Sequence, residues 1–192
     1  MKDLAQPNGD HHAVDMLHAP GTRFRYDRLA ILMHWAIFLL VVVAYAAVNL
    51  RGPKGSESRD FWMGIHVWAG LLVLGLSLLR LGWRLTHGPP PVDSSSIVMT
   101  WLAKAAHIAL YAFIILQPIF GVLTFNVEGN PVPLLGTGMS FSIVGANASL
   151  APLVEDLHEA VGEIFYYVIG LHAAAALWHH YVLRDDTMRR MI

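Results

Sequence analysis

The chain has 192 residues, of which 55% are hydrophobic and only 14% are charged, and its mean hydropathy is +0.48. This composition excludes an ordinary soluble domain and indicates a small integral membrane protein. The formal net charge of -1 argues against nucleic-acid binding, and the absence of cysteine excludes disulfides, iron–sulfur clusters and covalently attached c-type haem.

The N-terminal segment differs from the rest of the chain. Its first 22 residues are polar and lack the apolar core and small-residue cleavage site of a signal peptide. Three histidines lie there, His11, His12 and His18, but a flexible tail offers them no supporting hydrogen-bond partners. We expect residues 1–22 to form a disordered cytoplasmic tail, and residues 23–192 to form one membrane domain.

Four apolar stretches follow the tail, at about 29–50, 61–83, 102–125 and 157–183. Each is about as long as the 20 residues that a helix needs to cross a bilayer. The first and third are unambiguous, whereas Arg80 interrupts the second, and Glu159 and Glu163 interrupt the fourth. Their lengths predict an all-α integral membrane protein, a bundle of four transmembrane helices.

Basic residues are unevenly distributed between the two ends of these spans. Ten lie at one end: Lys2, Arg23, Arg25, Arg28, Arg80, Arg84, Lys104, Arg184, Arg189 and Arg190. Three lie at the other, Arg51, Lys54 and Arg59, and residues 126–156 contain none. Because Lys and Arg favour the cytoplasmic side, we predict that both termini are cytoplasmic.

The connection between the third and fourth spans, residues 126–156, is longer than antiparallel helices require. We expect it to form a cap over the outer face. Pro152 suits the first turn of a helix, and Glu155 and Asp156 complement the positive end of a helix dipole. The fourth helix is therefore expected to begin outside the membrane and to carry His158 at the outer boundary.

Five histidines lie within or at the mouth of the spans, where an ionisable side chain is costly and indicates function. They are His34, His66, His107, His158 and His172. His158 and His172 are 14 residues apart on one predicted helix, which brings them to within roughly 40° of the same face, about 21 Å apart along the axis. One face of this helix then carries one candidate ligand in each leaflet.

Depth predicts how the histidines pair. His66 and His158 lie toward the outer side, and His34 and His172 lie toward the cytoplasm. Two opposed imidazoles suit six-coordinate haem iron, whereas zinc needs three or four converging ligands. We predict an outer haem iron held by His66 and His158 and an inner one held by His34 and His172, both noncovalent. Each histidine taken singly is equally consistent with an interhelical hydrogen bond.

Small and basic residues lie near these candidate ligands. Gly70 follows His66 by four positions, and Gly162 follows His158 by four, which would let a flat macrocycle approach. Small residues equally serve ordinary helix packing in membranes. The arginines that could neutralise haem propionates, or could merely determine topology, are Arg51, Arg59, Arg23, Arg25, Arg28 and Arg84.

Polar residues near the cytoplasmic ends of the third and fourth spans leave alternatives open. Lys104, His107 and Tyr111 are spaced i, i+3, i+7 and form one stripe. This stripe could hydrogen-bond a quinone carbonyl or a haem propionate, or could simply lie at the membrane interface. His179 shares a face with His172 and lies nearer the depth of His34, so by geometry alone it is a rival inner ligand.

Three stretches of the chain are distinctive: Leu32-Met33-His34-Trp35, Gly64-Ile65-His66-Val67, and the run from Ile169 through His172 to Tyr181. Because of these stretches, the chain from about Arg25 to its C-terminus shows a resemblance to the bacterial di-haem cytochrome b561 family. It implies a four-helix bundle in a bacterial inner membrane, two haem b groups stacked across it, and electron exchange with ubiquinone. In that family the ligands come from helices one, two and four, 14 residues apart on the fourth, which disfavours His179.

Within that family, the chain resembles single-chain members that pass electrons from superoxide on the outer side through the haems to ubiquinone. The resemblance therefore implies a superoxide:ubiquinone oxidoreductase, with superoxide steered by Arg51, Lys54 and Arg59. The cofactor would carry the chemistry, so no catalytic side chain is expected. The alternative is an electron-conduit subunit that links a hydrogenase or dehydrogenase to the quinone pool. The short cytoplasmic loops offer little docking surface, so we expect no obligatory protein partner.

Overall fold

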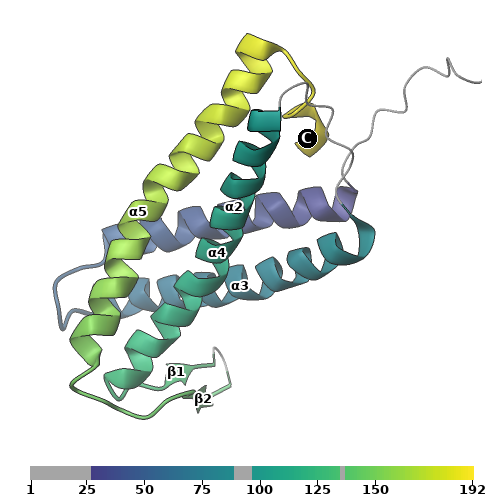
Figure 1. Ribbon diagram of the computed structural model, residues 1–192. Coiled ribbons are helices and arrows are strands. Elements are labelled where there is room, and N and C mark those ends of the chain that lie inside the picture. Colours follow the sequence, from purple (N-terminus) through teal and green to yellow (C-terminus); the bar gives the residue numbers. More distant parts are fainter. Residues whose placement is uncertain (1–26, 89–96, 135–136) are drawn as a thin grey trace, which may run out of the picture.

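The computed structural model describes residues 27–88, 97–134 and 137–192 (Figure 1). Its long helices are α2 (Arg28–Leu50), α3 (Glu57–His87), α4 (Ile97–Val127) and α5 (Ala151–Trp178). The short strands β1 (Val132–Pro133) and β2 (Ser140–Phe141) pair antiparallel. A π-helix, η2 (His179–Leu183), and a 3-10 turn, η3 (Arg189–Met191), complete the chain. The predicted tail, residues 1–22, lies outside the described residues.

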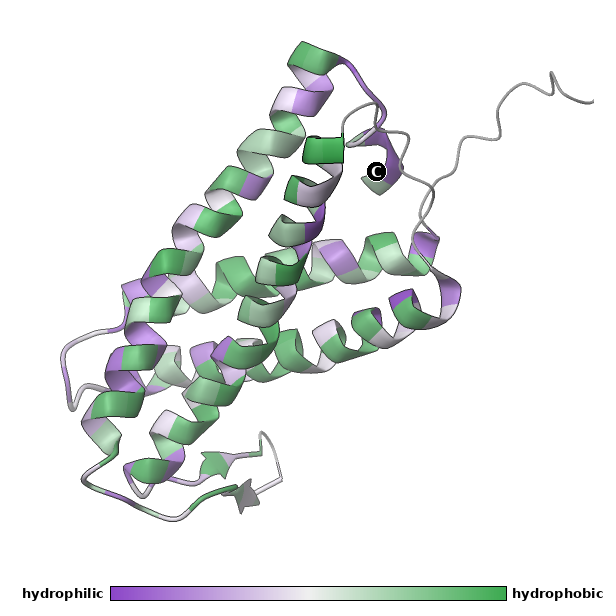
Figure 2. Cartoon of the chain, in the orientation of Figure 1, coloured by the Kyte–Doolittle hydropathy of each residue, from purple (hydrophilic) through white to green (hydrophobic). Residues whose placement is uncertain are grey.

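All four long helices are long and apolar enough to cross a membrane. Apolar residues run along the length of each, as the green ribbon in Figure 2 shows. Large side chains such as Leu32, Leu79, Ile108 and Leu171 are more than half exposed. Such a surface is favourable only against lipid, where a helix satisfies its own backbone hydrogen bonds. The predicted all-α bundle of four transmembrane helices is confirmed.

Three helices begin earlier than the apolar stretches predict. α3 begins at Glu57, where the Ser56 hydroxyl caps the helix by accepting a hydrogen bond from the Arg59 N–H at 3.2 Å. α4 begins at Ile97, and α5 begins at Ala151. Hydropathy detects the part of a helix that lipid surrounds, but not the polar turns beyond it. The expected starts at 61, 102 and 157 are therefore too late by several residues.

The start of α5 confirms that this helix extends beyond its apolar stretch. Pro152 lies in the first turn, where its missing N–H leaves no hydrogen bond unmade. Glu155 and Asp156 lie beyond the first turn, which contains no acidic residue. Because the dipole effect falls off within that turn, these two carboxylates complement it less than expected.

The connection between α4 and α5 contains the β1–β2 hairpin and folds against one end of the bundle (Figure 1). Asn126, at the end of α4, is only 1% exposed. Its Oδ1 accepts a hydrogen bond from the Ile143 N–H at 2.8 Å, and its amide donates to the Asn130 carbonyl at 3.1 Å. A buried amide that is satisfied on both sides fixes this loop to the helix.

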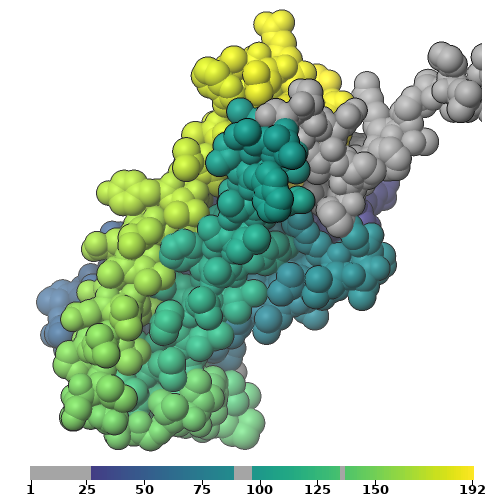
Figure 3. All heavy atoms as spheres, viewed as in Figure 1, coloured from purple at the N-terminus to yellow at the C-terminus, as the bar shows by residue number. Residues whose placement is uncertain are grey.

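The helices form two antiparallel pairs, α2 with α3 and α4 with α5, and α3 also packs against α4. The second pair crosses in front of the first at a steep angle (Figure 1), and its side chains form one continuous surface across this face (Figure 3). Large side chains connect α2 to α5: the Tyr45 and Tyr166 rings lie 4.0 Å apart, and the Tyr45 hydroxyl donates to the Gly162 carbonyl at 2.7 Å. Residues between the two pairs thus come from helices that are distant in sequence.

Candidate metal centres

The first histidine pair lies between α3 and α5. The ring centroids of His66 and His158 are 6.1 Å apart, and the ring planes are inclined at 82°. The Nδ1 atom of His66 lies 2.9 Å from the Ala44 carbonyl oxygen on α2. Because a carbonyl only accepts, Nδ1 carries the proton, and Nε2 is left available as a metal ligand.

Helix α4 positions the His158 ring from the other side. The Gln117 amide donates a hydrogen bond to the His158 backbone carbonyl at 2.6 Å. One turn further along α4, a Cβ atom at Gly121 would lie only 3.1 Å from Cε1 of His158. The Nδ1 atom of His158 is buried without a hydrogen-bond partner among the described residues. An unpaired buried nitrogen costs about 1–3 kcal/mol, and a metal–nitrogen bond is one way to remove that cost.

The second pair lies between α2 and α5. The His34 and His172 centroids are 6.5 Å apart with planes at 83°. His107 of α4 also approaches His172, at 6.2 Å between centroids. The Nδ1 atom of His107 lies 2.6 Å from the Ala103 carbonyl oxygen. Three histidines therefore meet at this end of the bundle.

Two arginines of α3 border this group of three histidines. Arg80 is an electrostatic neighbour of His34 and His172, and both Arg80 and Arg84 are neighbours of His107. The two guanidinium carbons each lie 5.9 Å from the centroid of the Tyr111 ring. Sequence analysis treated Arg80 only as a topology determinant, because a single sequence does not reveal which side of α3 faces α4 and α5.

The other polar residues singled out from the sequence, near the cytoplasmic ends of the third and fourth spans, lie partly in the interior and partly at the surface. The Tyr111 hydroxyl is buried without a partner among the described residues. Lys104 is exposed, and its ammonium lies 5.0 Å from the centroid of the exposed Trp101 ring. His179, the rival inner ligand, places Nδ1 2.5 Å from a carboxylate oxygen of Asp185.

The separation within each pair matches what a shared metal ion requires. Imidazole nitrogens bind metals at about 2.0–2.1 Å and lie about 1.1 Å from the ring centre, so opposed ligands need centroids about 6.3 Å apart. The observed separations are 6.1 Å for His66–His158 and 6.5 Å for His34–His172, and the 6.2 Å between His107 and His172 meets the same requirement. No group of three or more His, Cys, Asp or Glu side chains in the described ranges could hold a metal ion. The His66–His158 site thus offers two imidazoles, the number that a six-coordinate haem iron accepts from a protein, and the other site offers His172 together with His34 or His107.

The two glycines near the ligands differ in their surroundings. A Cβ atom at Gly70, one turn from His66, would meet no other atom within 4 Å. A Cβ atom at Gly162 would lie 3.0 Å from the side-chain nitrogen of Gln117. Gly70 therefore leaves room for a flat ring, whereas Gly162 makes room for the glutamine that bonds the His158 carbonyl.

Comparison with known proteins gives one consistent result. The family model described as prokaryotic cytochrome b561 matches residues 25–192. Probable superoxide oxidase CybB of Yersinia pestis is 34% identical over 169 residues, which cover 88% of this chain and 96% of that protein. Cytochrome b561 homolog 1 of Escherichia coli is 34% identical over 173 residues, 88% of this chain and 97% of the homolog. Cytochrome b562 of Cereibacter sphaeroides is 28% identical over 191 residues, 92% and 98% of the two chains.

Proposed function

The chain belongs to the prokaryotic cytochrome b561 family of membrane electron-transfer proteins, which bind b-type haem, and we propose that it transfers electrons from superoxide to ubiquinone. The observation that carries this proposal is the presence of two histidine pairs, one toward each end of the bundle, each spaced for a single metal ion. The name of one relative, probable superoxide oxidase, supplies the electron donor.

Two haem b groups are assigned to the two pairs, one to His66 and His158 and the other to His34 and His172. When bound, each haem supplies a centre that accepts and releases one electron. The chain's own residues hold and orient these centres. The two ligands on α5 are about 21 Å apart along the helix, which is most of the roughly 30 Å hydrocarbon thickness.

The overall reaction balances in electrons and protons. Each superoxide anion gives up one electron and leaves as O2. Two such electrons, together with two protons from water, convert ubiquinone into ubiquinol. His107 and Tyr111 are the proposed polar contacts of a quinone carbonyl or a haem propionate, and the buried Tyr111 hydroxyl supports this role. Lys104 is assigned to the membrane surface near them.

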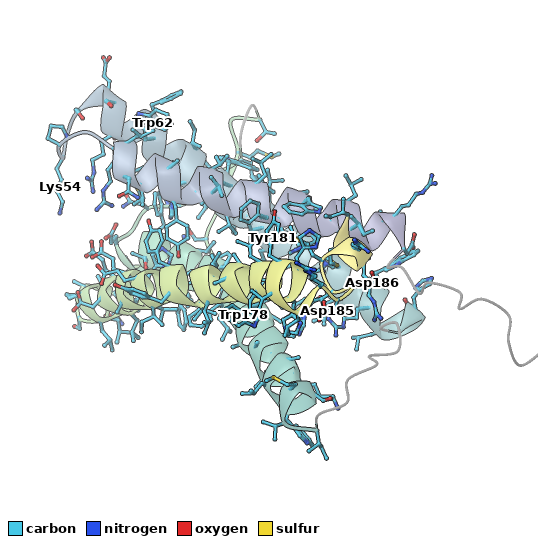
Figure 4. The ribbon with its side chains drawn as sticks, turned by 90° about the horizontal axis from the view of Figure 1, so that it is seen from above. Lys54, Trp62, Trp178, Tyr181, Asp185 and Asp186 are labelled. Carbon is cyan, nitrogen blue, oxygen red and sulfur yellow. The ribbon has the colours of Figure 1, made fainter. Side chains whose placement is uncertain are left out.

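We place the protein in a bacterial inner membrane with both termini in the cytoplasm. The two ends of the bundle are separated in Figure 4, where Lys54 lies at one end and Asp185 and Asp186 lie at the other. Superoxide is expected to approach over the α2–α3 turn, where Arg51, Lys54 and Arg59 supply positive charge. Exposed carboxylates on the outer half of α5 disfavour approach from that side: Glu155, Asp156, Glu159 and Glu163.

Rapid-mixing spectroscopy of the oxidised protein in detergent tests this function. Superoxide should reduce the haems within the mixing experiment, and added ubiquinone should then reoxidise them. His66→Ala should abolish the fast reduction, whereas His87→Ala should not, because His87 is exposed and stacks on Trp83 with centroids 3.8 Å apart. Added superoxide dismutase should also abolish it.

A haem spectrum that responds to a chemical reductant but not to superoxide would overturn the proposal. That outcome would favour the electron-conduit function, in which a partner enzyme supplies the electrons. The names of the other relatives, cytochrome b561 homolog and cytochrome b562, specify no electron donor and are compatible with either function. The response of the haems to superoxide distinguishes the two functions.

A further inference from the structure

Two carbonyl groups of α5, one turn apart, each accept a hydrogen bond from a side chain of another helix. The Tyr45 hydroxyl of α2 donates to the Gly162 carbonyl at 2.7 Å. The Gln117 amide of α4 donates to the His158 carbonyl at 2.6 Å. A backbone carbonyl has two lone pairs, so it can accept such a bond in addition to its helical one. Two different helices therefore hold α5 at the turn that begins with His158.

The same turn of α2 also holds His66. The Nδ1–H of His66 donates to the carbonyl of Ala44, the residue before Tyr45, with the two atoms 2.9 Å apart. A rotation of α2 would therefore disturb the acceptor for His66 and the donor to Gly162 together. The two candidate ligands are connected through this turn, because Ala44 bonds the ring of one and Tyr45 bonds the turn that carries the other.

Gly162 provides the space that the Gln117 bond requires. A Cβ atom at Gly162 would lie 3.0 Å from the side-chain nitrogen of Gln117, closer than an ordinary van der Waals contact. The nitrogen would then have to leave its position 2.6 Å from the His158 carbonyl oxygen. The missing side chain at 162 and the amide at 117 thus belong to one arrangement.

Hydrogen bonds of this kind restrict a motion that packing alone permits. Between helices in lipid there is no hydrophobic driving force, and their association depends on close packing and on hydrogen bonds. A bond from a neighbouring side chain to a backbone carbonyl limits the rotation of α5 about its own axis. The His158 ring moves with that rotation. Groups that orient a metal ligand in this way commonly affect metal affinity as strongly as 10–100-fold.

We propose that Tyr45 and Gln117 are positioning residues of the His66–His158 pair. Through their bonds to α5 they keep the His158 imidazole opposite His66, so that an iron bound between the two rings stays six-coordinate. A closed coordination sphere leaves small molecules no position on the iron. This inference rests on the proposed assignment of a haem to this pair, and it adds the groups that hold the axial ligands in place.

Carbon monoxide binding to the chemically reduced holoprotein tests the proposal, because carbon monoxide binds a six-coordinate iron only where an axial ligand has dissociated. Tyr45→Phe and Gln117→Met each remove one donor and nearly keep the shape of the side chain. Each should raise the carbon monoxide-bound fraction of one haem by roughly fivefold, the effect of losing one typical hydrogen bond. That haem should be the one that His66→Ala lacks, and its EPR signal in the oxidised protein should also change.

Gly162→Ala tests the Gln117 bond without changing Gln117. Because the new methyl group displaces the Gln117 nitrogen, this variant should reproduce the effect of Gln117→Met on the same haem. The other haem should keep its wild-type spectrum in all three variants. Wild-type carbon monoxide binding and an unchanged EPR signal in both Tyr45→Phe and Gln117→Met would overturn the proposal.

Tyr166→Phe is the matched control for Tyr45→Phe. The Tyr166 hydroxyl accepts a hydrogen bond from the Asn49 amide at 3.0 Å, so it also joins α5 to α2, but one turn further from His158. Both haems should therefore remain as in the wild type. Equal effects of the two tyrosine variants, or equal changes at both haems, would indicate a general loosening of the bundle and would also overturn the proposal. Neither superoxide nor quinone is used, so the result is independent of the proposed substrates.

Discussion

At the scale of single residues, the orientation of the histidine rings is the most informative feature of the two sites. The ring planes are inclined at 82° in the His66–His158 pair and at 83° in the His34–His172 pair. If each pair held a ferric haem iron at this inclination, the perpendicular imidazoles would leave the two iron dπ orbitals nearly degenerate. Low-temperature EPR of the oxidised protein should therefore show two highly anisotropic low-spin signals. Ordinary rhombic signals, which parallel rings give, would contradict the observed orientation.

Gly121 is a second residue whose effect is predictable. Gly121→Ala would bring a methyl group to 3.1 Å from Cε1 of His158, closer than ordinary van der Waals contact, so the ring must turn or shift. We expect the EPR signal and potential of the His66–His158 haem to change while those of the other haem stay constant. Gly75→Ala on α3 is the control, because Gly75 is exposed and its new methyl would meet nothing within 4 Å. An equal response of both haems to Gly121→Ala would refute this prediction.

Sequence reasoning at this scale found the histidines but not all of their partners. The 14-residue spacing of His158 and His172 is a property of one helix and can be computed from the sequence. The contacts of Gln117 and Gly121 with His158, and the approach of Arg80 to the Tyr111 ring, each join two helices. Such contacts depend on the rotation of each helix about its axis, which one sequence does not determine.

At the scale of elements, the C-terminal end of α5 is held by its own hydrogen bonds. The helix widens into η2 and ends at Arg184, whose left-handed backbone (φ 53°) lets its N–H donate to the His179 carbonyl. Beyond this turn, the Trp35 indole N–H of α2 donates to the Met191 carbonyl at 2.8 Å. The last residues of the chain therefore fold back beside His34, the residue that precedes Trp35.

The Asp185 carboxylate makes this turn sensitive to pH. Burial raises its pKa, but hydrogen bonds from His179 and Thr187 outweigh burial, and the net pKa lies below the ordinary value of 3.8. A depressed carboxyl pKa stabilises the folded turn above that ordinary value, and the stabilisation is lost as the pH falls through the folded-state pKa. The protection factors of the amides in residues 184–191, which correct hydrogen exchange for its intrinsic pH dependence, should therefore fall below about pH 4.

Asp185→Asn should reproduce that loss of protection at neutral pH, because it removes the charge to which His179 and Thr187 donate hydrogen bonds. Asp186→Asn is the matched control, since Asp186 pairs only weakly, at 3.5 Å, with Arg189. Equal exchange rates in the two variants would show that the His179–Asp185 bond does not hold the turn.

At the scale of the whole molecule, the crossing of two helix pairs explains why the sites lie where they do. α2 with α3, and α4 with α5, pack closely as antiparallel pairs (Figure 1), and each candidate ligand on α5 approaches a histidine of the first pair. Hydropathy predicted the four spans because lipid contact imposes a composition on each helix separately. It did not predict the crossing of the pairs, which depends on side chains such as Tyr45 and Tyr166 that fill the space between α2 and α5.

The most direct test of the whole account is the number of haems per chain in the purified protein and its ligand variants. Quantification as the pyridine haemochrome against protein concentration should give two haems in the wild type. His66→Ala and His34→Ala should each retain about one, and the double variant should retain none. A single haem in the wild type, or full haem content in either single variant, would contradict the assignment of one haem to each histidine pair.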